Sequence, residues 1–185
     1  MLISRILGAF TFRKDVYAEV EFDSSFTKTA WILVAVVAFL NQLGSFLSAS
    51  NWLVSTIVGT ILAVLGFALA AWIVTWVGRA IFFADVGFDE LVRTLGLAYV
   101  WQGVGILGIV TAFSDSLSWV FAPVQIIAAI LMLAAWLIAA QEALDLKWVQ
   151  AIVAVALGWL AYFVITAITG GLALALFQLA LTLLG

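Results

Sequence analysis

The chain has 185 residues, of which 67% are hydrophobic and 9% are charged, and its mean hydropathy is +1.30. A soluble domain is about 45–50% apolar and about 25% charged, so this composition excludes a water-soluble fold. The net charge of −3 offers no basic face for nucleic acid, and the lack of cysteine and histidine removes disulfides, thiolate or histidine metal sites and His-activated nucleophiles.

The first 28 residues precede the first long apolar stretch. Apolar residues such as Leu2, Ile6 and Phe10 recur at helical spacing, and charged residues take most of the remaining positions. This pattern predicts one or two amphipathic helices that lie on the membrane surface. We therefore expect a cytoplasmic amphipathic segment over residues 1–28 and a single transmembrane domain over residues 29–185.

Five later segments are long enough to cross roughly 30 Å of hydrocarbon, which takes about 20 helical residues. They cover approximately residues 29–48, 52–78, 91–113, 119–141 and 148–168. The sequence thus predicts an all-α polytopic membrane protein: a bundle of five transmembrane helices with an N-terminal amphipathic interfacial helix. The apolar tail, residues 172–185, is short for a crossing. We expect it to pack in or along the outer leaflet, and a sixth span is the alternative.

The basic residues indicate the orientation. With five spans, all seven fall on one side of the membrane: Arg5, Arg13, Lys14, Lys28, Arg79, Arg93 and Lys147. Cytoplasmic connections carry the excess of Lys and Arg. The pattern predicts a cytoplasmic N-terminus and an external C-terminus.

Carboxylates cluster before the spans. Asp89, Glu90 and Asp145 stand where helices begin, and a capping role at the positive end of the helix dipole explains them individually. Capping does not explain Tyr17, Glu19 and Glu21, which lie too far upstream of the first span.

Three stretches carry a resemblance to a known family. They are "VYAEVEFDSSFTKTA" before the first span, "FDELVRTLGLAY" entering the third, and "AAQEALDLKWVQAIVAVALGWLAYFVI" leading into the fifth. In their order and spacing the chain resembles the Yip family, the Ypt/Rab-interacting five-span membrane proteins, in its compact prokaryotic-type form. The resemblance implies membrane organisation, trafficking or partner assembly in homo- or hetero-oligomers, without catalysis or cofactor. The compact form implies a plasma (inner) membrane.

We therefore expect a non-enzymatic membrane-organising or adaptor protein, with no metal and no cofactor. Its cytoplasmic face would dock a lipid headgroup, another membrane protein or a second copy of the chain. The candidate docking residues are Tyr17, Glu19, Asp23, Arg79, Asp89, Glu90, Arg93, Glu142 and Asp145.

A small channel or transporter is the alternative function. Arg79 follows "AWIVTWVG" near the end of the second span, where its long stem favours snorkelling to the interface. Paired instead with Glu142 or Asp85, it would form a cytoplasmic gate. A polar cavity that reaches mid-membrane would favour transport, and a solid apolar core would favour scaffolding.

Overall fold

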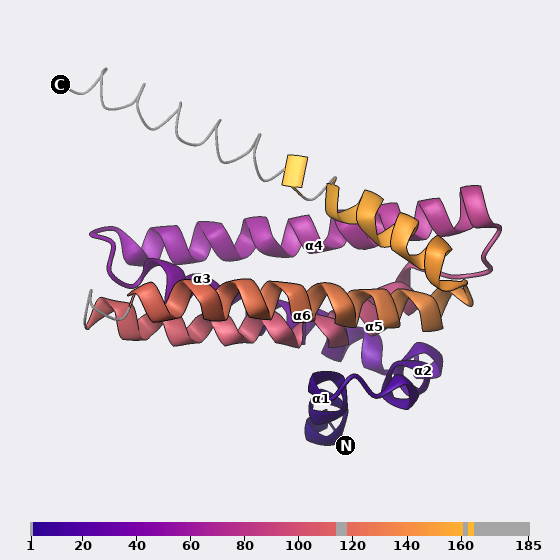
Figure 1. Ribbon diagram of the computed structural model, residues 1–185, viewed down its shortest axis with the longest axis horizontal. Coiled ribbons are helices and arrows are strands. Elements are labelled where there is room, and N and C mark those ends of the chain that lie inside the picture. Colours follow the sequence, from indigo (N-terminus) through magenta and orange to yellow (C-terminus); the bar gives the residue numbers. More distant parts are fainter. Residues whose placement is uncertain (1, 114–117, 161–162, 165–185) are drawn as a thin grey trace.

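The computed structural model describes residues 2–113, 118–160 and 163–164, and every regular element within them is a helix. Two short helices come first, α1 (Leu2–Phe10) and α2 (Lys14–Phe22). The long elements follow: α3 (Phe26–Phe46), α4 (Trp52–Phe82), α5 (Phe88–Ala98) with its 3₁₀ continuation η1 (Tyr99–Ala112), and α6 (Ser118–Leu144). These long elements lie side by side and run along the long dimension of the molecule (Figure 1).

Four helices are long and apolar enough to cross a membrane: Phe26–Phe46, Trp52–Phe82, Phe88–Ala112 and Trp119–Leu144. This is the architecture of an all-α, multi-pass membrane protein, and it confirms four of the five predicted spans by length and composition. The fifth predicted span, residues 148–168, begins as the shorter apolar helix Trp148–Leu160. Its remainder falls largely outside the described residues, as does the tail at 172–185.

The third span changes helix type half-way along. Its first half is α5, an α-helix of 11 residues, and its second half is η1, a 3₁₀ helix of 14 residues. Gly103, Gly105 and Gly108 weaken the α-helical preference of η1. A 3₁₀ helix rises about 2.0 Å per residue, so η1 alone extends about 28 Å, close to the thickness of the hydrocarbon core.

Helices α3 and η1 pack with their backbones in close contact. A Cβ added to Gly44 would lie 2.0 Å from the carbonyl oxygen of Gly105, and one added to Gly108 would lie 2.5 Å from the carbonyl oxygen of Gly44. Only glycine leaves room for this approach. In lipid, where apolar surroundings give helices little reason to associate, such close packing supplies the attraction between them.

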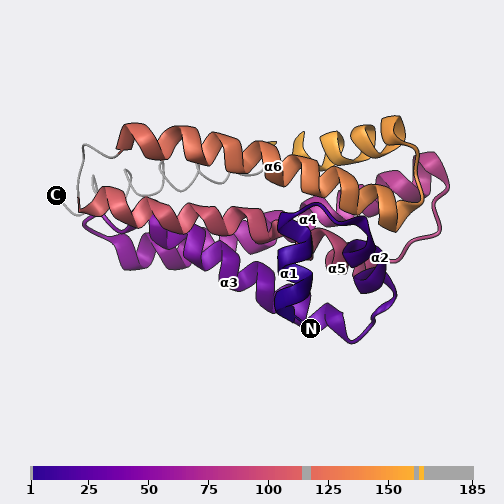
Figure 2. The same ribbon diagram turned by 60° about the horizontal axis from the view of Figure 1, so that its bottom comes forward.

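Helices α1 and α2 pack against the bundle beside α5 (Figure 2). The turn between them places Phe12 in the left-handed region, at φ 57°, and the ring of Phe12 stacks on Trp101 of η1 with the centroids 5.5 Å apart. Ala9, Tyr17 and Val20 are fully buried and belong to the same core as the spans. The segment 1–28 therefore shares its hydrophobic core with the bundle.

Candidate interaction surface at the charged end of the bundle

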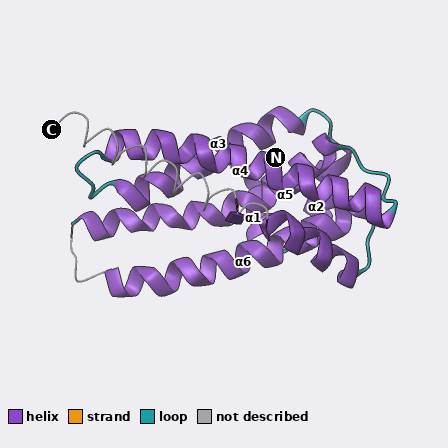
Figure 3. Cartoon of the chain, turned by 90° about the horizontal axis from the view of Figure 1, so that it is seen from above, coloured by secondary structure: helices purple, strands orange, loops and turns teal. Residues whose placement is uncertain are grey.

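One end of the bundle gathers the charged residues. Here α3 and α5 begin, α4 and α6 end, and α2 lies against α5 and α6 (Figure 3). Contacts between residues distant in sequence bring these elements together, such as the Arg93 guanidinium with Thr27 and the Lys14 ammonium with Glu142. We call this region the charged end.

Arg93 anchors α2 to the bundle. Its side chain points from α5 and is only 6% exposed, yet no carboxylate pairs with it among the described residues. The guanidinium Nε donates to the carbonyl oxygens of Val20 at 2.9 Å and Glu21 at 3.0 Å, Nη2 also donates to Glu21, and Nη1 donates to Thr27 Oγ1 at 3.1 Å. These carbonyls are among the last of α2, which have no partner inside the helix. A cation at this position also faces the negative end of the helix dipole.

Ion pairs hold α1 and α2 in place. Arg5 Nη2 lies 2.6 Å from Glu19 Oε1 and 2.9 Å from Asp23 Oδ2, and the Arg5 guanidinium sits over the Phe26 ring at 4.9 Å. These contacts lower the pKa of the Asp23 carboxyl, through hydrogen bonds from Ser25 and Arg5. Individually, exposed ion pairs contribute little to stability. Here they select one orientation of α1 relative to α2.

Lys14 connects α2 to α6. Its Nζ lies 3.0 Å from Glu142 Oε1 and donates to Gln141 Oε1 at 3.3 Å, so α2 is tied to the last turn of α6. Glu90 is engaged within its own helix: its Oε2 accepts a hydrogen bond from the backbone N–H of Gly87 at 2.7 Å. This confirms the capping interpretation for Glu90.

Glu21 is a notable titratable group that the sequence analysis did not select. Burial raises the pKa of its carboxyl to about 7, and the negative charges of Asp145, Glu90 and Glu142 add to this effect, whereas Arg93 opposes it. The helical spacing of these residues in the sequence could have indicated this position. Glu21 follows Tyr17 by one helical turn, on the side of α2 that faces the bundle, so a carboxylate was placed among buried residues.

Tyr17 and Arg93 require a correction, because neither is available for docking. Tyr17 is fully buried, burial raises the pKa of its phenol, and its hydroxyl donates to the Ala9 carbonyl at 3.5 Å. Apolar residues on both sides of Tyr17 in α2 turn this face inward, so its ring packs in the core. The guanidinium of Arg93 is already hydrogen-bonded to carbonyl oxygens of α2. Four further candidates make the contacts within the fold described above: Glu19, Asp23, Glu90 and Glu142.

Three candidates remain exposed and without a partner among the described residues: Arg79, Asp89 and Asp145. The same exposure and lack of a partner among the described residues hold for Lys28, Asp85 and Lys147. Across the described part of the chain, no three acidic residues come close enough to hold a metal ion.

The comparisons with known proteins give no relative. No family model, no curated protein and no solved structure matches this chain.

Proposed function

We propose that this chain is a non-enzymatic membrane protein of Yip type that organises the membrane or assembles partners through its charged end. The charged end faces the cytoplasm of a plasma (inner) membrane, and the C-terminus lies outside. Its occupant is another membrane protein or a second copy of the chain, with membrane lipid around the contact.

The observation that carries this proposal is the division of the charges. On α1 and α2, Arg5, Lys14 and Glu19 form ion pairs that tie the two helices to each other and to α6. Six charges of both signs stay exposed beside them with no partner among the described residues: Lys28, Arg79, Asp85, Asp89, Asp145 and Lys147. Such charges on a rigid support favour particular partners by complementarity and disfavour others.

The tryptophans of α4 support a position for the bilayer. Trp52 and Trp72 are 39% and 55% exposed and stand 20 residues apart. At about 1.5 Å per residue they are about 30 Å apart, the thickness of the hydrocarbon core, and tryptophan prefers both of its boundaries. Arg79, about two turns beyond Trp72, then lies among the headgroups.

Helix α1 supports the same position of the bilayer. Ile3 and Leu7 are 74% and 60% exposed on its outer face, although Ala9 is buried against the bundle. An exposed apolar face beside paired charges suits a helix that lies at the boundary between headgroups and acyl chains.

Two features favour this role over a channel or transporter. No acidic or basic residue occurs in α3 after Lys28, in α4 before Arg79, in η1, or in α6 before Glu142. Ion paths through membranes are normally marked by such groups. The described core between the spans consists mainly of apolar and aromatic side chains, and the polar residues Asn41 and Gln102 within it are hydrogen-bonded to each other.

Crosslinking in native membranes tests the proposal. A triple variant, Asp85→Asn with Asp89→Asn and Asp145→Asn, removes three exposed carboxylates that make no described hydrogen bond or ion pair. Of the three, Asp145 acts on one described group, through its charge on Glu21. We expect the crosslinked adducts of the wild-type chain to be lost or reduced at least about tenfold. Asp15→Asn is the control and should keep them: it removes an exposed carboxylate from α2 whose one described ion pair is with the neighbouring Arg13.

Two results would contradict the proposal. One is an adduct pattern in the triple variant that equals the wild type. The other is saturable solute or ion flux into proteoliposomes that is lost on Arg79→Ala, because that would establish transport.

A further inference from the structure

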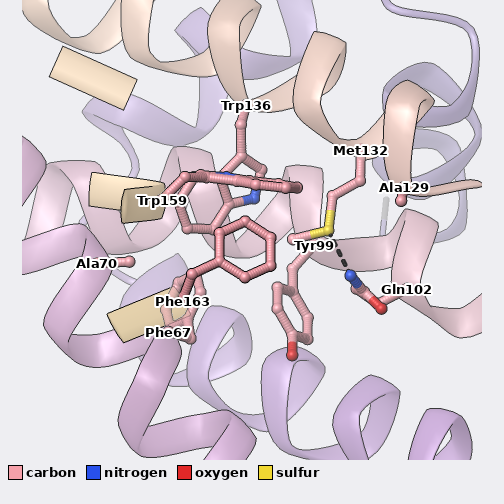
Figure 4. A pocket seen from close by; sticks show the side chains of 9 residues that line it. All are labelled: Phe67, Ala70, Tyr99, Gln102, Ala129, Met132, Trp136, Trp159 and Phe163. Carbon is pink, nitrogen blue, oxygen red and sulfur yellow. Dashed lines mark hydrogen bonds between the residues drawn. The ribbon is translucent and has the colours of Figure 1, made fainter. Parts of the chain in front are cut away.

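Five aromatic rings line a cavity between the helices (Figure 4). Successive rings meet in edge-to-face contacts with centroid distances of 5.4, 5.9, 6.3 and 5.6 Å, in the order Tyr99, Phe67, Trp136, Trp159 and Phe163. The cavity has a volume of about 180 Å³. A cavity of about 150 Å³ lined by apolar side chains holds benzene, so this one accommodates a single substituted six-membered ring.

A hydrogen-bond donor reaches this apolar space from Gln102. The side-chain oxygen of Gln102 accepts from Asn41 Nδ2 at 3.0 Å, and Asn41 Nδ2 also lies 2.8 Å from the Gln102 carbonyl oxygen. This fixes the amide so that its NH₂ faces the cavity, where it donates to Met132 Sδ at 2.8 Å (Figure 4). A thioether is a weak acceptor, so a carbonyl oxygen would be a better partner.

A second buried donor, the indole N–H of Trp136, lies behind the wall of the cavity. It has no acceptor among the described residues, and protein atoms enclose it on all sides. The cavity therefore offers a ligand one donor, the Gln102 amide.

The lining also selects the electronic character of a ligand. Indole and phenol rings carry negative charge on their faces, and they pack well against rings that are poor in electrons. Phe67 and Ala70 lie less than two turns from Trp72 on the membrane side, so a ligand dissolved in the hydrocarbon would be at the right depth.

We propose that this cavity binds a quinone-type ring from the membrane: flat, electron-poor, six-membered and bearing carbonyl oxygens, with Gln102 Nε2 donating to one of them. The site is separate from the charged end. It rests on the bilayer position proposed from Trp52 and Trp72, but not on the docking role.

Equilibrium dialysis of the purified chain in detergent micelles, with empty micelles as background, tests this. The probes are duroquinone and durene, which share a ring and four methyl groups and differ in the two carbonyl oxygens. We expect saturable duroquinone binding, one per chain, at least about fivefold tighter than durene, the factor for one neutral hydrogen bond. Gln102→Leu should remove this preference, while Asn41 keeps its backbone acceptor.

Two further variants address the space itself. Ala129, which lines the cavity from α6, becomes a plug in Ala129→Trp, and duroquinone binding should be lost. Ala122→Trp is the matched control, because Ala122 is an exposed residue two turns away on α6 and should bind as the wild type does. If Gln102→Leu does not fold, Gln102→Met removes the same donor and keeps a longer, flexible side chain.

The proposal is overturned if duroquinone shows no saturable binding, or if durene binds equally well. It is also overturned if the folded Gln102 variant, Gln102→Leu or Gln102→Met, binds duroquinone as tightly as the wild type does. Any of these would leave an apolar cavity without selectivity for carbonyl-bearing rings.

Discussion

Replacing Arg93 by methionine should release α1 and α2 from the bundle without unfolding the spans. Methionine fills similar space but donates no hydrogen bond, so the carbonyls of Val20 and Glu21 lose their buried partner. Hydrogen bonds to charged groups contribute about 1.5–3 kcal/mol each, and they are not additive. We expect docking of the two helices to weaken by about 2–4 kcal/mol, which raises the population of the open state about 30- to 900-fold.

Cysteine labelling measures this directly, because the chain has no cysteine of its own. Ala9→Cys places a single thiol at a fully buried position of α1, and its rate of reaction with a maleimide in micelles reports opening. The rate should rise by the factor above in Arg93→Met and about fivefold in Thr27→Val, which removes one of the hydrogen bonds. Arg79→Met, an exposed and unpaired arginine, is the control. An unchanged rate in Arg93→Met would refute the anchoring role.

Two other predictions concern pH and packing. The pKa of Glu21 is about 7 when folded and near 4.5 when unfolded, so its contribution to docking is complete below about pH 4.5 and is lost as the pH rises to about 7. The thiolate is the species that reacts, so every cysteine labels faster at higher pH. Relative to an exposed cysteine such as Asn51→Cys, labelling of Ala9→Cys should therefore accelerate over this range, and Glu21→Gln should remove that extra acceleration. Gly105→Ala would bring a Cβ to 2.1 Å from Asn41 Nδ2 and should lower thermal stability in detergent by at least about 1–3 kcal/mol. Gly103→Ala, whose nearest neighbour would be Val37 Cγ1 at 3.9 Å, should leave stability unchanged, and equal losses in both variants would contradict the close approach of α3 and η1.

The spans could be predicted because their signal is local. A helix that crosses the hydrocarbon core needs about 20 consecutive, mostly apolar residues, and such runs are easily recognised in a single sequence. The same runs leave room for charges only near the ends of the spans. The alternating direction of the spans then brings all seven basic residues to one end. The capping role of Glu90 was local as well, since the residue stands three positions after Gly87.

The role of Arg93 could not be read in this way. Its partners are backbone carbonyls 72 and 73 residues away, and no side-chain pattern records where a backbone carbonyl lies. The amphipathic pattern of residues 1–28 was correctly seen as helical, but it does not tell lipid from protein as the apolar neighbour. Tyr17 therefore looked like a surface residue and is buried.

The cavity depended on tertiary structure altogether. Its rings come from α4, η1, α6 and the last described helix, and each reads in sequence as an ordinary apolar residue. Asn41 and Gln102 were visible as polar residues within spans, but only packing places them in contact and directs the Gln102 amide.

The most direct test is two-sided labelling of sealed vesicles with a membrane-impermeant maleimide. Single cysteines replace four exposed residues: Arg13, Asp89 and Lys147 at the charged end, and Asn51 at the opposite end. We predict that the first three react only from the cytoplasmic side and that Asn51→Cys reacts only from outside. Reaction of Arg13→Cys and Asp89→Cys from opposite sides would contradict a single cytoplasmic charged end, and with it the docking role.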